Sequence, residues 1–301
     1  MKLRLGARGS ALSLAQATLA ERALSPHAEV ERIIVRTTGD QRSARGEPIG
    51  WKGDFTKEID EALLSGRIDL AVHSLKDVPS LLPEGLALAA VPEREDPRDV
   101  LVSKSRLPLL GLPQGARIGT SSPRRRAQLR RARPELDVVE ARGNVDTRLR
   151  RVAEGKWDAV VLARAGLARL GRLEEIVETF SEDLLLPAPG QGALAIVTRS
   201  DDAEVRALAQ RLDDAASHAE VLAERGLLAR LEAGCRAPLA ARAKARGSNL
   251  VLTAGVFSDD GSAALLETGE GPIEAAEQLG REVAERLLSR GAAGLIDTDR
   301  A

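Results

Sequence analysis

The 301-residue sequence is poor in the residue types on which several classes of protein depend. Its single cysteine, Cys235, excludes internal disulfides and suits a reducing compartment. Aromatic residues make up 2% of the chain and tyrosine is absent, so we expect no stacking platform for single-stranded nucleic acid or RNA loops. The three histidines, His27, His73 and His218, have no partners at metal-ligand spacing, so no metal site is expected.

The sequence also lacks an excess of charge and a long apolar run. Lys+Arg number 44 and Asp+Glu 45, which gives a net charge of -1 and argues against a nucleic-acid-binding protein. No apolar run approaches membrane-spanning length, and Arg8 lies where a signal peptide needs its apolar stretch. We therefore expect a cytoplasmic protein that contacts neither nucleic acid nor a membrane, and nothing in the sequence demands more than a monomer.

Short apolar runs alternate with segments of helical periodicity up to about residue 190, a pattern typical of βαβ units and mostly parallel sheets. Helices are predicted between the runs, for example over 10–24, 55–65, 123–133 and 145–154. The predicted strands cover residues 3–7, 31–37, 69–74, 86–92, 99–103, 116–121, 137–142 and 158–163.

Two segments interrupt this alternation and predict the domain organisation. EREDPRDVLVS (93–103) and LLLPAPGQGALAIV (184–197) place prolines, charges or glycines between apolar runs. They predict an α/β fold of two doubly wound lobes, the first formed by residues 1–92 and 193–212 and the second by 93–192. Residues 213–301 predict a small α+β C-terminal domain, with a helix over 214–232 and a hairpin turn at SDDGS.

Nearly every predicted strand of the two lobes ends in a cation, a hydroxyl or a glycine. Ligands of doubly wound sheets bind at the carboxyl ends of the strands, so these residues predict an anion site. In GTSSPRRRAQLRRAR (119–133), Ser122 can cap a helix that begins at Pro123, which places Arg124 and Arg125 at a helix start where anions bind. Arg126, Arg130 and Arg133 recur at helical spacing and predict a solvated outer face. Because no nucleotide-binding glycine loop is present, carboxylates are the expected anions.

Three reactive residues remain open on this reasoning. Asp77, among cations at a strand end, is either a structural counter-ion or a group that stabilises a positive reaction centre. His73 is either structural or a general acid. Cys235, beside Gly234 and Arg236, is either inert packing or a nucleophile with a neighbouring positive charge.

Eight motifs occur in the order seen in the porphobilinogen deaminase family, which the sequence resembles from Arg8 to its end. They are RGS (8–10), HSLKDVP (73–79), EREDPRD (93–99), GTSSPRR (119–125), RGNVDTR (142–148), AGLAR (165–169), PAPGQGA (187–193) and GCR (234–236). The resemblance implies a hydroxymethylbilane synthase of porphyrin and haem biosynthesis. Such an enzyme joins four porphobilinogen units, releases ammonia at each step and forms 1-hydroxymethylbilane.

The resemblance also implies a role for each matching residue. A dipyrromethane cofactor would be attached to Cys235 through a thioether, and Asp77 would be the catalytic carboxylate. The cofactor's carboxylates would be held by Lys76, Thr120, Ser122, Arg124 and Arg125, with Asp77 also in contact. The substrate or the growing chain would be bound by Arg8, Ser10, Gln16, Arg142, Asn144, Arg148 and Arg169.

Two positions depart from the family pattern. Asp54 stands before Phe55, where an apolar residue is usual, and this bears on closure of the loop GWKGDFTKE. Asp146 replaces a glycine or asparagine at a predicted helix start, where an acid is tolerated. A two-lobed solute-binding protein of the periplasmic type or a regulator's effector domain would share the predicted fold. The cysteine loop in a third domain argues against both.

Overall fold

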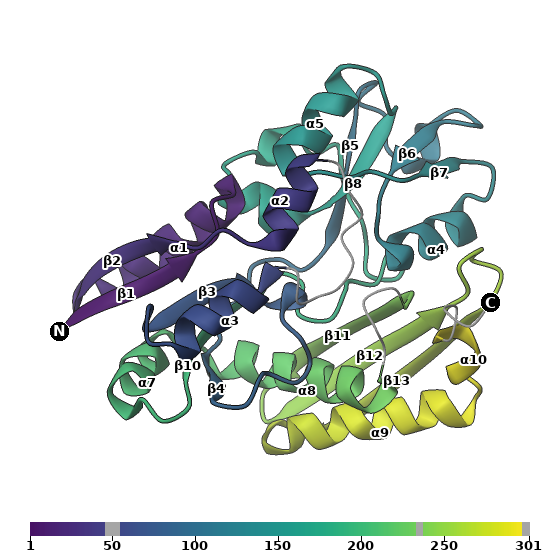
Figure 1. Cartoon of the computed structure of the whole chain (residues 1–301). Helices are drawn as coiled ribbons and strands as arrows, with labels where there is room; N and C mark the ends of the chain where they lie inside the picture. The colour runs from purple at the N-terminus through teal and green to yellow at the C-terminus, as the bar shows by residue number, and fades with distance from the viewer. Residues whose placement is uncertain (46–54, 233–236, 297–301) are drawn as a thin grey trace. The chain divides into compact units, whose positions relative to one another are not determined.

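A computed structural model describes residues 1–45, 55–232 and 237–296 of the chain (Figure 1). The chain divides into two compact units. The first unit contains Met1–Glu95 and Gly192–His218, and the second contains Asp96–Gln191 and Ala219–Ala301. The chain therefore leaves the first unit once and returns to it before entering the second unit again.

The first unit is built on a five-stranded sheet in the order β2-β1-β3-β10-β4. β1 pairs in parallel with β2 and β3, whereas β10 runs antiparallel to β3 and β4. The strands are β1 (Lys2–Ala7), β2 (Glu29–Ile34), β3 (Leu70–Ser74), β4 (Leu86–Ala90) and β10 (Leu194–Arg199). The helices are α1 (Ala11–Leu24), α2 (Thr38–Arg45), α3 (Lys57–Leu64) and α7 (Ala203–Ala209), with 3-10 turns at Leu75–Asp77 and Gln210–Leu212.

The core of this unit follows directly from the apolar pattern of its strands. Leu3 and Leu5 of β1 are fully buried and pack with Ala17 and Leu24 of α1. β3 is buried along almost its whole length, as expected for a strand in the middle of a sheet. Side chains of β3 and β10 extend the same cluster, so the loops at the strand ends rest on a rigid base.

The second unit repeats this strand arrangement in the order β7-β6-β8-β5-β9. β6 is parallel to β7 and β8, and β5 is antiparallel to β8 and β9. The strands are β5 (Asp99–Ser103), β6 (Arg117–Gly119), β7 (Asp137–Val139), β8 (Ala159–Ala163) and β9 (Glu178–Thr179). The helices are α4 (Pro123–Ala132), α5 (Val145–Ala153) and α6 (Arg164–Arg169), with 3-10 turns at Leu109–Gly111 and Leu173–Glu175.

The C-terminal part of the second unit has an antiparallel sheet, β11-β12-β13, covered by helices (Figure 1). Alternate side chains of the strands form one apolar cluster with α8 and α9. The elements are α8 (Ala215–Leu231), β11 (Leu239–Arg246), β12 (Asn249–Phe257), β13 (Ala264–Pro272), a 3-10 turn at Ile273–Ala275, α9 (Ala276–Ser289) and α10 (Ala293–Ile296). The SDDGS segment joins β12 to β13 as a hairpin, as predicted.

The α/β prediction for the lobes is confirmed, with two differences in detail. Mostly parallel sheets were predicted, whereas half of the strand pairs in each sheet are antiparallel, because β10 and β5 run against both of their neighbours. α2 was not predicted, since its sequence TGDQRSAR has no apolar stripe. The described residues include no helix long and apolar enough to cross a membrane.

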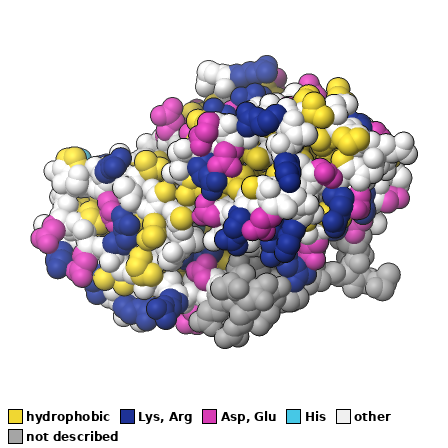
Figure 2. Space-filling view, turned by 90° about the horizontal axis from the view of Figure 1, so that it is seen from above, with side chains coloured by type: hydrophobic (Ala, Val, Ile, Leu, Met, Phe, Trp, Pro, Cys, Tyr) yellow, Lys and Arg dark blue, Asp and Glu magenta, His cyan; other side chains and the backbone are white. Residues whose placement is uncertain are grey.

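The prediction of a solvated outer face on α4 is wrong. Arg133 donates hydrogen bonds from its guanidinium to the carbonyl oxygens of Leu109 and Leu112, at 2.6 and 3.0 Å. Arg130 donates to the carbonyl oxygen of Asp259, in the β12–β13 hairpin, at 3.1 Å. The C-terminal sheet thus packs against α4, an arrangement that helical spacing alone does not reveal. On the face of the molecule shown in Figure 2, basic and acidic side chains are intermixed.

Candidate active site

The predicted site residues lie where strands of the two sheets end. In the first unit, Arg8 and Ser10 follow β1, and Lys76 and Asp77 follow β3. In the second unit, the residues that follow β6, β7 and β8 include Thr120, Ser122, Arg142, Asn144 and Arg169. Because parallel strands of one sheet end at the same edge, each unit gathers its own set of predicted residues at one edge.

Arg8 is held in place by an acid, a hydroxyl and an aromatic ring. Its Nε donates to both carboxylate oxygens of Asp40 at 3.1 Å, and its Nη2 donates to Oδ1 at 2.5 Å. The guanidinium carbon lies 4.0 Å from the centre of the Phe55 ring, within the range of a cation–π contact. The backbone N–H donates to Ser13 Oγ at 3.0 Å. Ser10 caps α1 by accepting a hydrogen bond from the backbone N–H of Ser13.

Lys76 and Asp77 form a single 3-10 turn directly after β3, and both side chains are half-buried. Gln16 is buried and donates its amide to Ser74 Oγ at 2.7 Å, one residue before this turn. Gln16 was predicted as a substrate contact. The hydrogen bond that the structure shows for its side chain ties α1 to the end of β3.

His73, on β3, is fully enclosed and its Nε2 has no hydrogen-bond partner among the described residues. Burial, with a smaller contribution from the positive charge of Arg8, lowers the pKa of His73 to about 4. The imidazole is therefore neutral near pH 7, because a proton there would be both desolvated and repelled. An imidazole with this pKa is almost fully deprotonated near pH 7, which argues against His73 as a general acid.

We expect the stability of the wild type to fall relative to that of a His73→Gln variant as the pH drops from 6.5 to 4. In this window the unfolded chain binds a proton at His73 and the folded chain does not, so acid favours unfolding by up to roughly 3 kcal/mol. Asp60, whose pKa burial raises to about 6, works in the opposite direction in both proteins. Melting temperatures of the pair across this range test the effect, and a constant difference would contradict it.

α4 begins at Pro123, with Ser122 before it as the cap, as the sequence predicts. Ser122 is the N-cap, and its side chain accepts a hydrogen bond from the backbone N–H of Arg125 at 3.4 Å. Thr120 is buried, and its Oγ1 accepts from the backbone N–H of Ser122 at 3.1 Å. Thr120 and Ser122 therefore shape the turn between β6 and α4.

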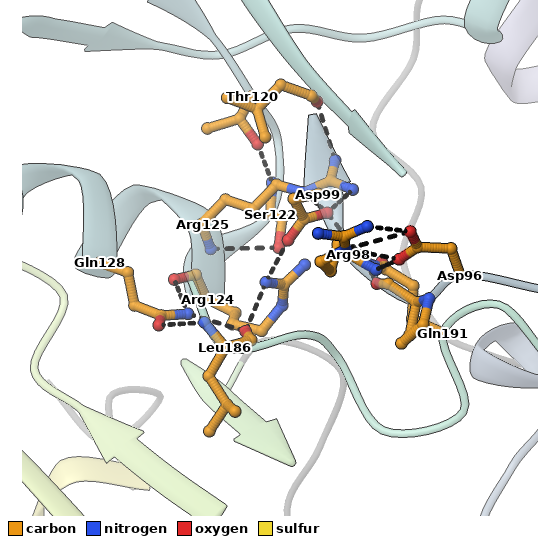
Figure 3. Close-up of polar contacts among 12 residues, drawn as sticks. Asp96, Arg98, Asp99, Thr120, Ser122, Arg124, Arg125, Gln128, Leu186 and Gln191 are labelled. Atoms are coloured by element: carbon orange, nitrogen blue, oxygen red, sulfur yellow. Dashed lines mark hydrogen bonds and ion pairs between the residues drawn. The ribbon is translucent and has the colours of Figure 1, made fainter. Parts of the chain in front are cut away.

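Arg124 and Arg125 converge on one internal carboxylate, that of Asp99 (Figure 3). Asp99 begins β5 and is completely buried. Arg124 Nη1 donates to its Oδ2 at 2.6 Å, and Arg125 donates to Oδ1 from Nε at 3.0 Å and from Nη2 at 2.6 Å. Gln191 Nε2 donates to the same Oδ1 at 2.9 Å.

Burial alone would raise the pKa of Asp99, but the charges and hydrogen bonds of Arg124 and Arg125 hold it well below its usual range. Asp99 is thus ionised. The sequence interpretation treated the two arginines as partners for an external anion only. The structure shows that they share an internal one, Asp99, which ends the motif EREDPRD (93–99) but to which the sequence interpretation gave no role.

Asp99→Ala should lower the free energy of unfolding of the protein by about 3 to 5 kcal/mol, because it leaves two buried guanidinium groups without their shared counter-ion. Asp137→Ala is the matched control. It removes a carboxylate from an exposed pair with Arg117, which contributes at most about 1 kcal/mol. Thermal or denaturant unfolding of the two variants measures the difference. Equal losses would mean that the Asp99 cluster adds nothing beyond a surface ion pair.

This cluster retains an excess of positive charge. Two arginines share one carboxylate, and Nε of Arg124 is buried without a hydrogen-bond partner. Burial, together with the like charges of Arg125 and Arg151, lowers the pKa of Arg148 to about 10. Mutual repulsion among three arginines is costly unless an anion relieves it. This edge of the second sheet is therefore suited to binding anionic groups.

The remaining predicted arginines lie on neighbouring elements. Arg142 pairs with Glu140 at 2.8 and 3.0 Å and is half-buried. Asn144 caps α5 by accepting from the backbone N–H of Thr147 at 2.9 Å, and Arg148 Nε donates to the carbonyl oxygen of Gly143 at 2.8 Å. Arg169 ends α6. Cys235 and Asp54 lie outside the described residues.

These strand ends define an α/β protein in which the first unit has an acidic turn after β3 and the second unit has clustered arginines at the edge of its sheet. The family model "Porphobilinogen deaminase, dipyromethane cofactor binding domain" matches residues 3–207, and the model of the C-terminal domain matches residues 218–289. The chain belongs to the porphobilinogen deaminase family.

Curated relatives agree over nearly the whole chain. A porphobilinogen deaminase of Rubrobacter xylanophilus is 52% identical over 98% of this chain and 96% of its own length. One of Syntrophus aciditrophicus is 46% identical over 98% of both chains. Among solved structures, the VFT2 domain of Bordetella pertussis BvgS has a TM-score of 0.42 and 18% identity over 70% of this chain and 86% of that one, a likeness too low to bear on function.

The described residues suit the cofactor named by the family model. A dipyrromethane bearing acetate and propionate groups offers several carboxylates in a small volume. The repulsion of Arg148 by Arg125 and Arg151 is the feature that such carboxylates would relieve. The charge of the second unit's site thus matches the charge of the group.

Proposed function

We propose that the chain is a hydroxymethylbilane synthase. It joins four porphobilinogen molecules head to tail, releases one ammonia for each, and frees the product 1-hydroxymethylbilane by hydrolysis. The observation that carries this proposal is the excess positive charge around Arg124, Arg125 and Arg148, in a chain that matches its family over nearly its whole length. Each substrate unit brings an acetate and a propionate, so the growing product needs such a surface.

In this proposal the site residues divide into three groups by role. Asp77 is the catalytic residue, and Cys235 anchors the cofactor through a thioether. Carboxylates of the cofactor are bound by Lys76, Thr120, Ser122, Arg124 and Arg125. Carboxylates of the substrate and the growing chain are bound by Arg8, Ser10, Gln16, Arg142, Asn144, Arg148 and Arg169.

Asp77 carries the chemistry because a half-buried carboxylate at a strand end can hold and move protons. In each step the C–N bond of the protonated aminomethyl group breaks, its electron pair leaves with ammonia, and the pyrrole ring is left as an azafulvenium-like cation. The carboxylate of Asp77 then stabilises the positive charge left on the pyrrole ring and accepts a hydrogen bond from the pyrrole N–H. After the new C–C bond forms, Asp77 helps to remove the proton from the pyrrole carbon. The bound cofactor supplies the pyrrole carbon to which the first unit is joined.

We further propose three domains, a monomeric state and a cytoplasmic location for the enzyme. Residues 1–92 with 193–212, 93–192 and 213–301 form the three domains. The enzyme acts as a monomer in the cytoplasm.

Incubation of the purified protein with porphobilinogen tests the proposal. We expect four ammonia molecules for every tetrapyrrole formed, with linear tetrapyrrole as the first product. Tight binding of porphobilinogen without ammonia release would instead favour a solute-binding protein of the same fold.

A further inference from the structure

We propose that Asp40, which lies outside the predicted site, is a positioning residue that presents Arg8 to one carboxylate of the incoming substrate. This inference rests on the proposed function, because it takes Arg8 as a substrate-binding residue. It adds which edge of the guanidinium the substrate uses and what holds that edge in place.

The guanidinium of Arg8 has one edge occupied by Asp40 and another left for a ligand. A guanidinium can bind a carboxylate along its side, through Nε and one Nη, or at its end, through both Nη atoms. Asp40 takes the side edge, since Nε and Nη2 are the donors in its three hydrogen bonds at 3.1, 3.1 and 2.5 Å. Among the described residues, none accepts a hydrogen bond from Nη1 of Arg8. The end edge is therefore the one left for a ligand.

Asp40 is itself kept in position by Thr37. Thr37 is completely buried, and its Oγ1 donates to Oδ2 of Asp40 at 2.8 Å. Oγ1 of Thr37 also accepts a hydrogen bond from the backbone N–H of Asp40 at 3.2 Å, in the first turn of α2. These two reciprocal hydrogen bonds hold the side chain of Asp40 against Thr37, at the start of α2. Because the buried threonine is anchored, the orientation of Asp40 is transmitted to Arg8.

The ring of Phe55 covers one face of the Arg8 guanidinium, with the ring centre 4.0 Å from the guanidinium carbon. With one edge and one face occupied, the Arg8 side chain has lost most of its rotational freedom before the substrate arrives. Ordering a long side chain on binding would otherwise weaken the affinity. A pre-oriented end edge therefore favours a planar carboxylate that approaches in the plane of the guanidinium.

Asp40→Asn tests this proposal, because asparagine keeps the shape but removes the charge and one acceptor. We expect the KM for porphobilinogen to rise about tenfold while kcat changes less than about twofold. Glu21→Gln is the matched control. Glu21 binds Arg32 through both oxygens at similar exposure on the same unit, away from the strand ends, so its KM should be unchanged.

A double-mutant cycle separates positioning from a general structural effect. Arg8→Lys replaces the fork by a single ammonium that cannot serve Asp40 and the substrate together. In the Arg8→Lys background, Asp40→Asn should raise KM by less than about twofold, because the coupling passes through the guanidinium. Independent, multiplying effects would overturn the proposal. A lower KM in Asp40→Asn would also overturn it, since Asp40 would then compete with the substrate for Arg8.

Two further readouts keep this result distinct from a failure of the proposed function. The intact mass of Asp40→Asn should show the same covalent cofactor as the wild type, because Asp40 does not touch that group in the proposal. Calorimetric titration of porphobilinogen into an Asp77→Ala protein, with and without Asp40→Asn, should show the same tenfold loss of affinity without turnover. If the wild type releases no ammonia, the proposed function fails first; if it does and the affinities are equal, only the role of Asp40 fails.

Discussion

Asp77→Ala is expected to abolish turnover while leaving the protein folded and its covalent cofactor in place. The variant lacks the carboxylate that stabilises positive charge on the pyrrole and moves its proton, two effects that together contribute about 10³- to 10⁴-fold in rate. The side chain is only half-buried in a short turn after β3, so its removal leaves no large cavity. Ammonia release from porphobilinogen measures the loss, and intact mass confirms that the cofactor remains.

Asp201→Ala provides the control for this result, because Asp201 is an exposed acid of the same unit. It should release ammonia at the rate of the wild type. If Asp77→Ala also turned over normally, Asp77 would be a counter-ion to its cationic neighbours, the alternative that its sequence context left open. Loss of the covalent cofactor in Asp77→Ala would mean that the carboxylate acts earlier, when the cofactor is assembled.

Cys235→Ala is expected to carry no covalent cofactor and to form no tetrapyrrole. Without the thiol there is no thioether, and the carboxylate-binding arginines of the second unit can hold only a freely dissociating ligand. The intact mass of the denatured wild type should exceed the polypeptide mass by two linked pyrrole units, and that of the variant should equal the bare chain.

Cys235→Ser separates the chemistry of the thiol from its size, and its mass should also be that of the bare chain. An excess mass that persists in Cys235→Ala would place the attachment on another residue. If the wild type itself has the bare mass, incubation with porphobilinogen and a second weighing decide between protein made without substrate and a reversible binder.

The strand ends show how far the sequence determines the site. Strands were predicted where β1, β3, β6 and β8 occur, because buried central strands are continuous apolar runs. Helix starts at Ser122 and Asn144 follow from capping, which is a local interaction between residues three apart. Local patterns are therefore sufficient to place the residues that follow these strands at the sheet edges.

Partners that are distant in sequence could not be predicted in the same way. Asp99 lies 25 residues before Arg124, and Gln191 lies 92 residues after Asp99, so no spacing links them. Asp40 was missed for a related reason, since the sequence of α2, TGDQRSAR, contains no large apolar residue to mark a face that packs on the core. Arg133 was assigned to solvent because helical periodicity says which residues share a face and not what packs against it.

The sequence by itself determined the family, the α/β alternation and the residues at the strand ends, because each depends on local patterns or on motifs of a few residues. Only the tertiary structure decided how the charges are partnered. Whether an arginine meets Asp99, Asp40 or a ligand depends on which strands lie side by side and which side chains are buried. Asp99 offsets the charges of Arg124 and Arg125 because the fold brings these three residues together, and an unpaired charge in the interior is costly.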